Sequence, residues 1–449
     1  MTFSKKFARY IVNMKYDHIP PDVLKFTKLC LLDYYASLLN GIQESPPRMM
    51  EQVIYILGGN EQATAASGYK TSVTNAAFIN GGASHVIELD DIHKASIVHA
   101  ATVIMPAALA VAEWKNCSGQ QLLEAIIVGY EVAFRIGETV TPAHYYYFHN
   151  TATCGTFGAT AAVCKLLQLN EEQIVHALGS AGTQAAGLWE FIEDGVMSKQ
   201  LHPGNAGVNG IMSALLAEVG FTGASAILEG KRGFFEAMAK TYDVEKLTNG
   251  LEEQYKIIEN SFKIHASCRH THAAMDLALQ VRNEYEITDI ESIEILTYEV
   301  ADTITNNPAP KTIYAAKFSI QFCVALAILK GTGNLQAFNE RSLNDPQIRS
   351  LMNNITVKVD ERITNNYPEK WGTKLIVTFK NGEVRTVETD YPKGDPENPL
   401  TSVDFIDKFQ TLSPLDFTHN EKIIECILQI EKYTVRHLIQ TIYAESTTA

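Results

Sequence analysis

The chain has 449 residues, 46% of them hydrophobic and 20% charged, a composition typical of a folded globular protein and unlike that of a disordered or fibrous one. Its 37 basic and 51 acidic residues give a formal net charge of −14, which argues against nucleic acid or an anionic membrane as a partner. The best apolar stretch, 103–111, is far shorter than the ~20 residues of a membrane span. The N-terminus resembles no secretory signal, and seven scattered cysteines without a CxxC pair favour reduced thiols, so we expect a cytoplasmic protein.

Apolar residues recur at helical spacing through the first 260 residues. This spacing predicts helices over 20–40, 119–137 (with Ser118 as the N-cap), 153–169, 170–187 and 205–220. The helix over 153–169 is rich in alanine and glycine, whose small side chains allow close helix packing. We therefore expect it in the middle of a helical bundle.

The pattern changes to alternating β-branched residues between positions 290 and 400. We expect strands over 292–300, 355–359, 375–379 and 384–389, the last two joined by a hairpin at Asn381-Gly382, with a helix over 315–331. The segment 391–399 is a Pro/Gly-rich connector, and the rest of the chain returns to a helical pattern. The predicted fold is mainly α, with a large helical domain (1–262), an inserted α+β lid domain (263–398) and C-terminal helices (399–449) that complete the first domain. A cleft between two domains is a favoured place for a small-molecule site.

Three carboxylates and two imidazoles fall within twelve residues of one predicted loop: Glu88, Asp90, Asp91, His93 and His99. A solvated interhelical loop would explain the charges equally well. However, the strongly apolar segment that follows implies that this loop enters the protein core.

Two further clusters precede predicted helices. His149 lies directly before the small-residue helix, whose N-terminus could hold an anion; alternatively, Thr151 or Thr153 only caps that helix. Lys199 and His202 flank a Pro-Gly turn and could face one pocket, although such a turn often carries an exposed lysine.

The strongest positive cluster is Lys263 with Arg269, His270 and His272, inside an otherwise acidic chain. In a helix that starts near 267, His272 and Asp276 would share a face at spacing i, i+4, so that Asp276 could orient the His272 ring.

Two chemistries could use these groups. A zinc or iron site could combine His270 and His272 with Asp90, Asp91 or His93. However, a His-x-His pair places both rings on one side only in a strand, and this segment enters a helix.

The other chemistry is metal-free removal of a proton next to a carboxylate, which requires a positioned base and a cationic surrounding. Lys199, Arg269 and Lys263 would hold carboxylates. His99, His149 and His272 would carry protons, because imidazole titrates near neutral pH.

The chain resembles the MmgE/PrpD family, which includes 2-methylcitrate dehydratase, cis-aconitate decarboxylase and iminodisuccinate epimerase. The resemblance covers essentially the whole chain and is carried by five motifs in order: Glu88-Leu89-Asp90-Asp91-Ile92-His93 with His99, Phe148-His149 through Ala159, Leu201-His202-Pro203-Gly204-Asn205-Ala206, Cys268-Arg269-His270-Thr271-His272 and Lys317-Phe318-Ser319-Ile320-Gln321-Phe322.

The resemblance implies a helical domain and a smaller lid with the active site between them, a homodimer, and no required metal or iron–sulfur cluster. It assigns active-site positions to Lys199, His99, His149 and His272. This chain departs from the family pattern at Glu88, where family members often have Asp, and at Ile92 and Phe322, which replace residues that carry a hydroxyl group.

We therefore expect a cofactor-independent lyase that acts on a small di- or tricarboxylate, as dehydratase or decarboxylase. His99 and His272 would exchange protons, with Asp91 and His149 in support. The substrate-binding set would comprise Glu88, Asp90, His93, His202, Lys263, Arg269, His270 and Phe322, without a metal. The alternatives are an epimerase of an N-substituted aspartate such as iminodisuccinate, a metallohydrolase that uses His270, His272 and Asp90, and a non-catalytic dicarboxylate-binding protein.

Overall fold

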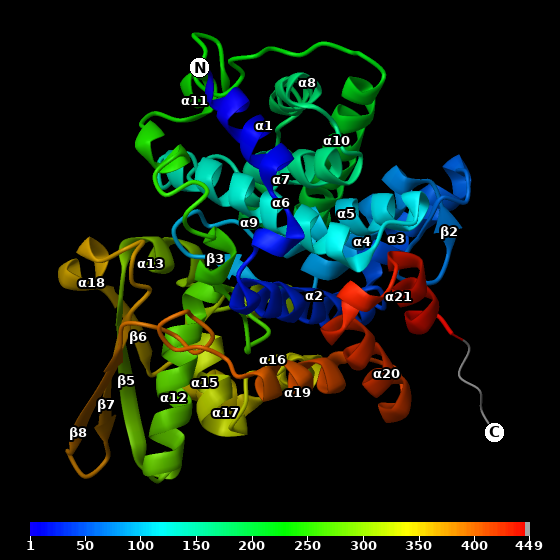
Figure 1. The fold of residues 1–449 in the computed structure, drawn as a ribbon. Helices are drawn as coiled ribbons and strands as arrows, with labels where there is room; N and C mark the ends of the chain where they lie inside the picture. The colour runs from blue at the N-terminus through cyan, green and yellow to red at the C-terminus, as the bar shows by residue number, and fades with distance from the viewer. Residues whose placement is uncertain (445–449) are drawn as a thin grey trace. The chain divides into compact units, whose positions relative to one another are not determined.

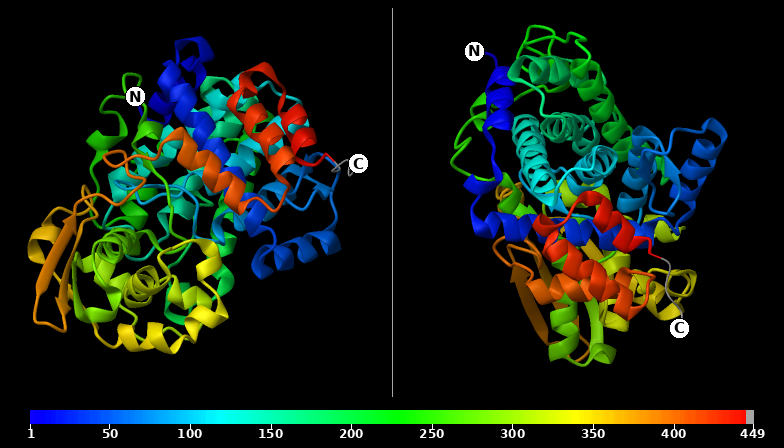
Figure 2. Two further views of the ribbon diagram at one scale, coloured as in Figure 1. Left: turned by 90° about the horizontal axis from the view of Figure 1, so that it is seen from below. Right: turned by 45° about the vertical axis from the view of Figure 1, so that its right-hand side comes forward.

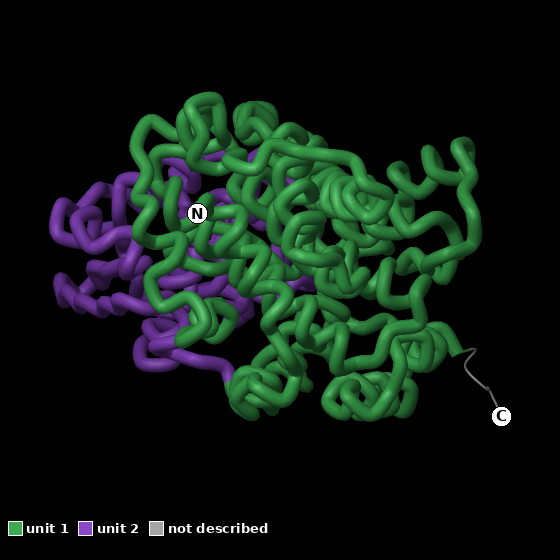
Figure 3. The backbone as a smooth tube through the Cα atoms, turned by 45° about the horizontal axis from the view of Figure 1, so that its top comes forward, with its two compact units in different colours: residues 1–86, 90–260, 401–449 green, residues 87–89, 261–400 purple. Residues whose placement is uncertain are grey.

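The computed structural model describes residues 1–444, which form two compact units (Figure 3). Unit 1 contains residues 1–86, 90–260 and the described residues from 401 onwards, and unit 2 contains residues 87–89 and 261–400. The three residues 87–89 therefore group with unit 2, although both neighbouring segments of the chain belong to unit 1.

Unit 1 is helical apart from two-residue strands (Figure 1). Its helices are α1 (Phe3–Asn13), α2 (Pro21–Gly41), α3 (Ser45–Leu57), α4 (Val73–His85), α5 (Ala101–Lys115), α6 (Gly119–Val140), α7 (Asn150–Leu166), α8 (Glu171–Gly182), α9 (Phe191–Asp194), α10 (Leu201–Glu218), α11 (Phe234–Met238), α19 (Ser402–Leu412), α20 (Phe417–Leu428) and α21 (Val435–Ile442). The short strands include β1 (Ala63–Thr64), β2 (Lys70–Thr71) and β3 (Ile92–His93).

The core of unit 1 forms around α7, which packs against α5, α6, α8 and α10. Small residues on α7 let these helices approach closely. A Cβ atom added to Gly158 would lie 2.7 Å from the backbone oxygen of Gly129 on α6, a separation too short for ordinary contact. The expected central position of the small-residue segment is thus confirmed, although α7 begins at Asn150, three residues earlier than predicted.

The C-terminal helices α19 and α20 pack along α2, near the other end of the sequence (Figure 2). Buried polar contacts join these distant segments. The Lys408 Nζ lies 2.6 Å from a carboxylate oxygen of Asp33, and the Asn40 side chain donates to the Leu412 carbonyl at 2.8 Å. The residues after 401 therefore belong to the same packed body as the N-terminal helices.

Unit 2 is built on a four-stranded sheet of order β6-β5-β7-β8. Strand β5 (Ile290–Thr297) is parallel to β6 (Ile355–Val359) and antiparallel to β7 (Thr373–Phe379), which in turn pairs antiparallel with β8 (Val384–Thr389). Helix α12 packs against β7 and β8, and α15 packs against α12 (Figure 1). The helices of this unit are α12 (His272–Glu284), α13 (Glu299–Thr305), α14 (Ile313–Ala316), α15 (Ile320–Lys330), α16 (Glu340–Leu343), α17 (Pro346–Met352) and α18 (Glu361–Asn365).

Several predicted elements are confirmed, and neighbouring residues explain where they begin or turn. Ser118 caps α6 in a reciprocal capping box with Gln121. Strands β6 and β8 have the predicted bounds, and Gly382 takes the left-handed conformation (φ 83°) in the turn between β7 and β8. The mainly α fold class is confirmed.

Several predicted boundaries differ from the structure, and two of the differences have a clear local cause. The helix expected over 315–331 is broken into α14 and α15, because Ser319 turns out of the helix and caps a new one through Phe322 N. Helix α10 begins at Leu201 rather than near 205, so His202 and Pro203 lie in its first turn, where the missing N–H of proline leaves no hydrogen bond unmade. Within residues 1–444, no helix combines the length and apolar character needed to cross a membrane.

The packing of α6 on α7 generates a stability test. Gly158→Ala should lower the free energy of unfolding by about 1–3 kcal/mol, because the added methyl group meets a backbone oxygen that cannot move aside. Gly207→Ala on α10 is the matched control: its nearest neighbours lie at 3.5 Å or more, so higher helix propensity should leave stability equal or raise it by up to about 1 kcal/mol. Urea denaturation measures both, and equal effects of the two substitutions would contradict the packing argument.

Candidate active site

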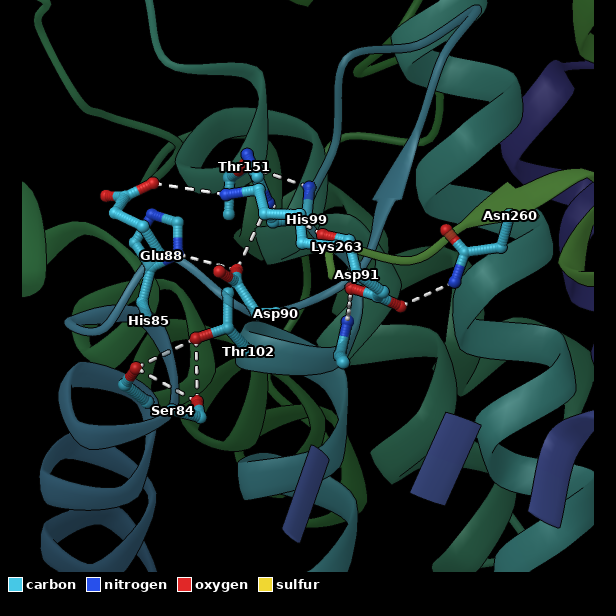
Figure 4. A network of polar contacts seen from close by, with 12 residues as sticks. Ser84, His85, Glu88, Asp90, Asp91, His99, Thr102, Thr151, Asn260 and Lys263 are labelled. Atoms are coloured by element: carbon cyan, nitrogen blue, oxygen red, sulfur yellow. Dashed lines mark hydrogen bonds and ion pairs between the residues drawn. The ribbon is translucent and has the colours of Figure 1, made fainter. Parts of the chain in front are cut away.

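Asp91 anchors the loop that runs from Asp90 to His99 in unit 1. Its side chain is completely buried and accepts three hydrogen bonds, from Tyr130 Oη (2.8 Å), Asn260 Nδ2 (2.6 Å) and the backbone N–H of Ala101 (3.0 Å). Figure 4 shows the contact with Asn260. Ala101 is the first residue of α5, so the carboxylate also satisfies one of the unpaired N–H groups at the helix start. The loop enters the core here, as the apolar segment after it indicated.

The surroundings of Asp91 have opposite effects on the ionisation of its carboxylate. Burial raises the pKa of Asp91 to about 7, while the bonds from Asn260, Ala101 and Tyr130 act to lower it and the neighbouring Asp90 acts to raise it. Because all three neighbours donate, they favour the ionised carboxylate. The charge of Asp91 thus depends on intact donors.

The ring of His99 is oriented by the same loop. Its Nδ1 lies 2.6 Å from the backbone oxygen of Asp91 and 3.1 Å from a carboxylate oxygen of Asp90. A carbonyl oxygen only accepts, so Nδ1 carries the proton and Nε2 carries the lone pair in the neutral ring. The backbone N–H of His99 donates to Thr151 Oγ1 on α7 at 3.0 Å. His99 therefore has the geometry of a base that acts through Nε2.

His85, the last residue of α4, was not among the predicted site residues. It is fully buried, and its Nδ1 lies 2.6 Å from the same Asp90 oxygen that faces His99. The rings of His85 and His99 meet edge to face, with centroids 5.0 Å apart. A histidine at the end of an apolar helix, five residues before a buried aspartate, is the only sequence signal that could have indicated it.

Two predicted histidines, His149 and His202, contact each other. His149 precedes the first residue of α7 and His202 lies in the first turn of α10, and their Nδ1 atoms are 3.1 Å apart. The backbone N–H of His149 donates to the carbonyl of Gly187, which has a left-handed conformation (φ 143°) and where a Cβ would lie 2.6 Å from Ala152. The ring of His149 also stacks on His85, with centroids 5.6 Å apart.

Lys199 lies in a 3-10 turn, Met197–Gln200, and is almost entirely buried. The charge of Lys199 acts on the pKa of both His149 and His202. Burial lowers the pKa of His149 well below 6.5, and His202, His85, Lys199 and His99 lower it further. Burial likewise lowers the pKa of His202 to about 4, with His85 and Lys199 adding to the effect. Both rings are therefore neutral at physiological pH, next to a buried cation.

His93, a predicted substrate-binding residue, is held by a separate buried group. Its Nδ1 lies 2.9 Å from Ser96 Oγ and its Nε2 lies 3.6 Å from Glu138 and 3.5 Å from Glu259. Lys256 pairs with the same two glutamates at 3.0 and 3.1 Å. Burial acts to raise the pKa of Glu259, but His93 and Lys256 outweigh it and lower that pKa to about 2.

In unit 2, Glu88 and Lys263 form a buried ion pair with Nζ and Oε2 3.1 Å apart. Glu88 has a left-handed backbone conformation (φ 61°), which is costly for a residue with a Cβ. Tyr314 Oη lies 3.5 Å from the other carboxylate oxygen. Both residues were predicted to bind substrate, and in this structure each contacts the other.

Arg269 is also engaged by its own chain. It pairs with the buried carboxylate of Asp395, and its Nη1 donates to the Phe262 carbonyl and to Nδ1 of His272, at 3.1 and 3.0 Å. Because arginine only donates, Nδ1 of His272 is the acceptor and Nε2 carries the proton, directed at the Ser267 carbonyl 3.4 Å away. Burial lowers the pKa of His272 well below 6.5, and the charges of Arg269, His265 and Lys263 add to this effect.

The expected pairing of Asp276 with His272 is wrong. Asp276 accepts from Nε2 of His265 at 2.8 Å and from the backbone N–H of Lys393 at 2.7 Å. The segment before α12 is a 3-10 turn that begins at Arg269, so α12 starts only at His272. His272 and Asp276 have the i, i+4 spacing, but His265, which lies outside the helix, binds the Asp276 carboxylate.

The last two predicted residues of unit 2 are packed in its interior. Nδ1 of His270 lies 2.6 Å from Tyr298 Oη, and its ring stacks on Trp371 with centroids 4.5 Å apart. Phe322 is buried on α15 and contacts the ring of Phe338. These contacts fix both side chains within unit 2.

Among the described residues, two groups of three side chains place possible metal-ligating atoms within 4.8 Å of one another: His85, Asp90 and His99, and His93, Glu138 and Glu259. Neither includes His270 or His272, whose Nδ1 atoms face Tyr298 and Arg269. In the first group the atoms already bond to one another, and in the second Lys256 neutralises the glutamates. The alternative metal set with His270 and His272 is not supported.

A helical body with a buried imidazole–carboxylate cluster and a smaller α+β body is the arrangement of a small-molecule enzyme rather than of a structural module. The sequence profile of the MmgE/PrpD N-terminal domain matches residues 5–247, and that of the MmgE/PrpD C-terminal domain matches residues 265–432. The chain belongs to the MmgE/PrpD family.

Relatives with a described activity align over most of the chain. The cis-aconitate decarboxylase of Mus musculus is 28% identical over 429 residues, covering 91% of this chain and 86% of the relative. The enzyme of the same name from Homo sapiens is 26% identical and covers 96% and 92%. The mitochondrial 2-methylcitrate dehydratase of Yarrowia lipolytica is 24% identical and covers 86% and 79%. These names favour the decarboxylase or dehydratase hypothesis over the epimerase and the non-catalytic alternatives.

The low pKa of His202 predicts a specific pH dependence of stability. The ring stays neutral in the folded state down to about pH 4, whereas in the unfolded chain it gains a proton below about 6.5. The stabilisation from the neutral ring is therefore complete above pH 6.5 and is lost as the pH falls toward 4. The difference in unfolding free energy between wild type and His202→Asn should shrink by about 1–3 kcal/mol over this range.

Chemical denaturation at pH 7.0 and at several values down to 4.5 measures this difference. His176→Asn on α8, whose ring contacts the Gly223 carbonyl, controls for the loss of a histidine elsewhere in unit 1. A wild-type advantage over His202→Asn that grows on acidification would contradict the assignment.

Proposed function

We propose that the chain is a cofactor-independent lyase that transfers a proton at the carbon next to a carboxylate of a small di- or tricarboxylate. In a dehydration this proton is removed and the hydroxyl group leaves as water, and in a decarboxylation CO₂ leaves and the carbon gains a proton. Family membership supports the class of reaction, and the names of the relatives supply the candidate substrates, cis-aconitate and 2-methylcitrate. The observation that carries the proposal is the His99 ring, held at Nδ1 by Asp90 and the Asp91 carbonyl so that its lone pair is on Nε2.

His99 is the proposed base. A carbon acid next to a carboxylate is very weak, so the base must be positioned and must gain stabilisation as it becomes charged. Asp90 supplies that stabilisation, because its carboxylate lies 3.1 Å from the nitrogen that carries the proton of the imidazolium ion. His149, neutral and close to the same cluster, would donate a hydrogen bond to the substrate or the intermediate.

Lys199 is the proposed cation for the reacting carboxylate. Negative charge builds up on this group as the proton leaves, and a buried ammonium stabilises it more than an exposed one does. The chain carries a net charge of −14, so a polyanionic substrate needs such a local positive site. His202, in the first turn of α10, would contribute a neutral hydrogen-bond donor or acceptor.

We propose substrate-binding roles for two residues of unit 2, Lys263 and His272. Lys263 would exchange its Glu88 partner for a substrate carboxylate, which Glu88 would otherwise oppose. His272 keeps its proton on Nε2 and would act as a hydrogen-bond donor rather than as the base. The four groups that face Arg269, including Asp395 and His272, favour a positioning role for this residue over direct contact with substrate.

The reaction needs no redox step and no activated water, so a lyase of this kind can work with protein groups alone. We propose that the enzyme requires no metal or other cofactor. The compartment is predicted to be the cytoplasm, although one relative is named as mitochondrial.

Turnover assays with cis-aconitate, 2-methylcitrate, citrate, malate and N-substituted aspartates test the proposal. His99→Gln should lower kcat/KM roughly 10²–10⁴-fold on the substrate that is turned over, because general-base catalysis contributes about that much. Lys199→Met should raise KM and lower kcat together, since the cation contacts both substrate and developing charge. His176→Asn is the control and should keep wild-type kinetics.

Near-normal turnover by His99→Gln would remove His99 as the base. Thermal stabilisation of the wild type by one of these acids without any conversion would instead favour a non-catalytic binding protein.

We also propose a homodimer that forms through α3. Apolar side chains at spacing i, i+4, i+7 and i+8 cover one face of this helix: Met49, Val53, Ile56 and Leu57. Ile56 and Leu57 are 85% and 72% exposed, so an isolated chain would leave this apolar surface in contact with water, which is unfavourable. A second copy of this chain that covers this face would remove the apolar surface from water.

The dimer prediction is tested by analytical ultracentrifugation. Wild type should sediment as a dimer, and Val53→Glu with Ile56→Glu should shift it toward the monomer, because two carboxylates per subunit would have to be buried. Val403→Glu on α19 replaces a similarly exposed valine (63%) outside α3 and should leave the dimer intact. An unchanged dimer in the double variant would place the interface elsewhere.

A further inference from the structure

His85 belongs to no predicted site, yet it lies at the centre of the unit 1 cluster. It ends α4, has no exposed surface, and contacts Asp90 through Nδ1 at 2.6 Å (Figure 4). Its other ring nitrogen, Nε2, is buried with no hydrogen-bond partner among residues 1–444. A buried imidazole with one strong contact and one unmade bond requires an explanation, because native structures rarely leave such groups unsatisfied.

The donor and the acceptor in the contact between His85 and Asp90 can be assigned. Asp90 Oδ2 lies 2.6 Å from His85 Nδ1 and 3.1 Å from His99 Nδ1, so one oxygen serves two imidazoles. When Asp90 is ionised it only accepts, and His85 must donate from Nδ1, which leaves the lone pair on Nε2. The unmade bond of His85 is therefore an acceptor, which is less costly to bury without a partner than a donor-bearing cation would be.

We propose that His85 is a positioning residue that acts on His99 through the shared carboxylate of Asp90 and sets how strongly the His99 ring holds its proton. The inference rests on the proposed function, because it concerns the residue proposed as the base. His85 competes with His99 for the same oxygen, and the shorter bond goes to His85. The bond to His85 weakens the interaction of the Asp90 carboxylate with the His99 ring. His99 therefore holds its proton less tightly and stays available as a base near neutral pH.

Other charged and titratable groups face this pair and bear on its protonation. Asp91 comes from the same loop, His149 from the start of α7, His202 from α10 and Lys199 from the 3-10 turn before it. The rings of His149 and His202 are neutral, and Lys199 is a cation that also disfavours a proton on the histidines. His85 lies 2.6 Å from Asp90 Oδ2, so removal of His85 has a distinct effect.

Three variants separate positioning from simple packing. His85→Leu removes the donor and fills the site with an apolar side chain. His85→Asn keeps an N–H group at the position of Nδ1 and should preserve the bond to Asp90. Asp90→Asn removes the shared charge. His176→Asn on α8 is the control histidine substitution outside the cluster.

The readout is the titration of the His99 ring by NMR in protein labelled at histidine ¹³Cε1, with the signal assigned by its loss in His99→Gln. His85→Leu should raise the His99 midpoint by about half a unit to one unit, as expected when a hydrogen bond of ordinary strength is lost from its partner. His85→Asn should stay close to wild type, and Asp90→Asn should lower the midpoint. The acid limb of kcat/KM should move with the NMR midpoint on whichever acid is turned over.

An unchanged His99 midpoint in His85→Leu, or equal shifts in His85→Leu and His85→Asn, would overturn the inference. If His85→Leu does not fold, His85→Met replaces it with a more flexible apolar side chain, and an unchanged midpoint in Asp90→Asn overturns the inference as well. The NMR titration needs no turnover. A coupled titration without activity would therefore refute the proposed function and leave the link between His85 and His99 standing.

Discussion

The buried carboxylate of Asp91 is the interaction on which the site of unit 1 depends. A charge with no exposed surface must be matched by donors, and Asp91 finds them on α5, on α6 and at Asn260. These three donors lie far apart in the sequence and are brought together only by the packed helices. The loop between Asp90 and His99 is therefore fixed as part of the core, although its sequence is that of a polar surface loop.

The geometry around the proposed base follows from this anchor. Once the Asp91 side chain is held, its backbone carbonyl meets Nδ1 of His99, and Asp90 is placed between the rings of His85 and His99. One loop thus determines the tautomer of the proposed base, its orientation and its charge partner. Lys199 and His149 come from other elements, whose small residues let α7 and α10 pack closely. The small-residue helix therefore matters for the site as well as for stability.

Local sequence signals predicted the local structure well. The capping box of Ser118 and the Asn-Gly turn before β8 have causes within a few residues, and both are confirmed. Partners that are distant in sequence could not be predicted in this way. Glu88 pairs with Lys263, 175 residues later, and Asp276 binds His265 rather than the histidine at spacing i, i+4. Likewise His85 looks like one more residue of the apolar helix α4 until the fold places Asp90 against it. Residue type and clustering thus supplied candidates for the chemistry, but not the groups that hold these candidates in place.

Deuterium transfer tests the central claim, proton transfer by His99 at the carbon next to a carboxylate, most directly. The enzyme is incubated in D₂O with the acid that it turns over, and recovered substrate and product are analysed by mass spectrometry. With wild-type enzyme the account predicts deuterium on a carbon next to a carboxylate. It should be found in the product of a decarboxylation, where that carbon gains a proton as CO₂ leaves, and in the recovered substrate of a dehydration, where proton removal is reversed. His99→Gln should incorporate almost none at equal protein concentration, and equal incorporation by His99→Gln would contradict the account.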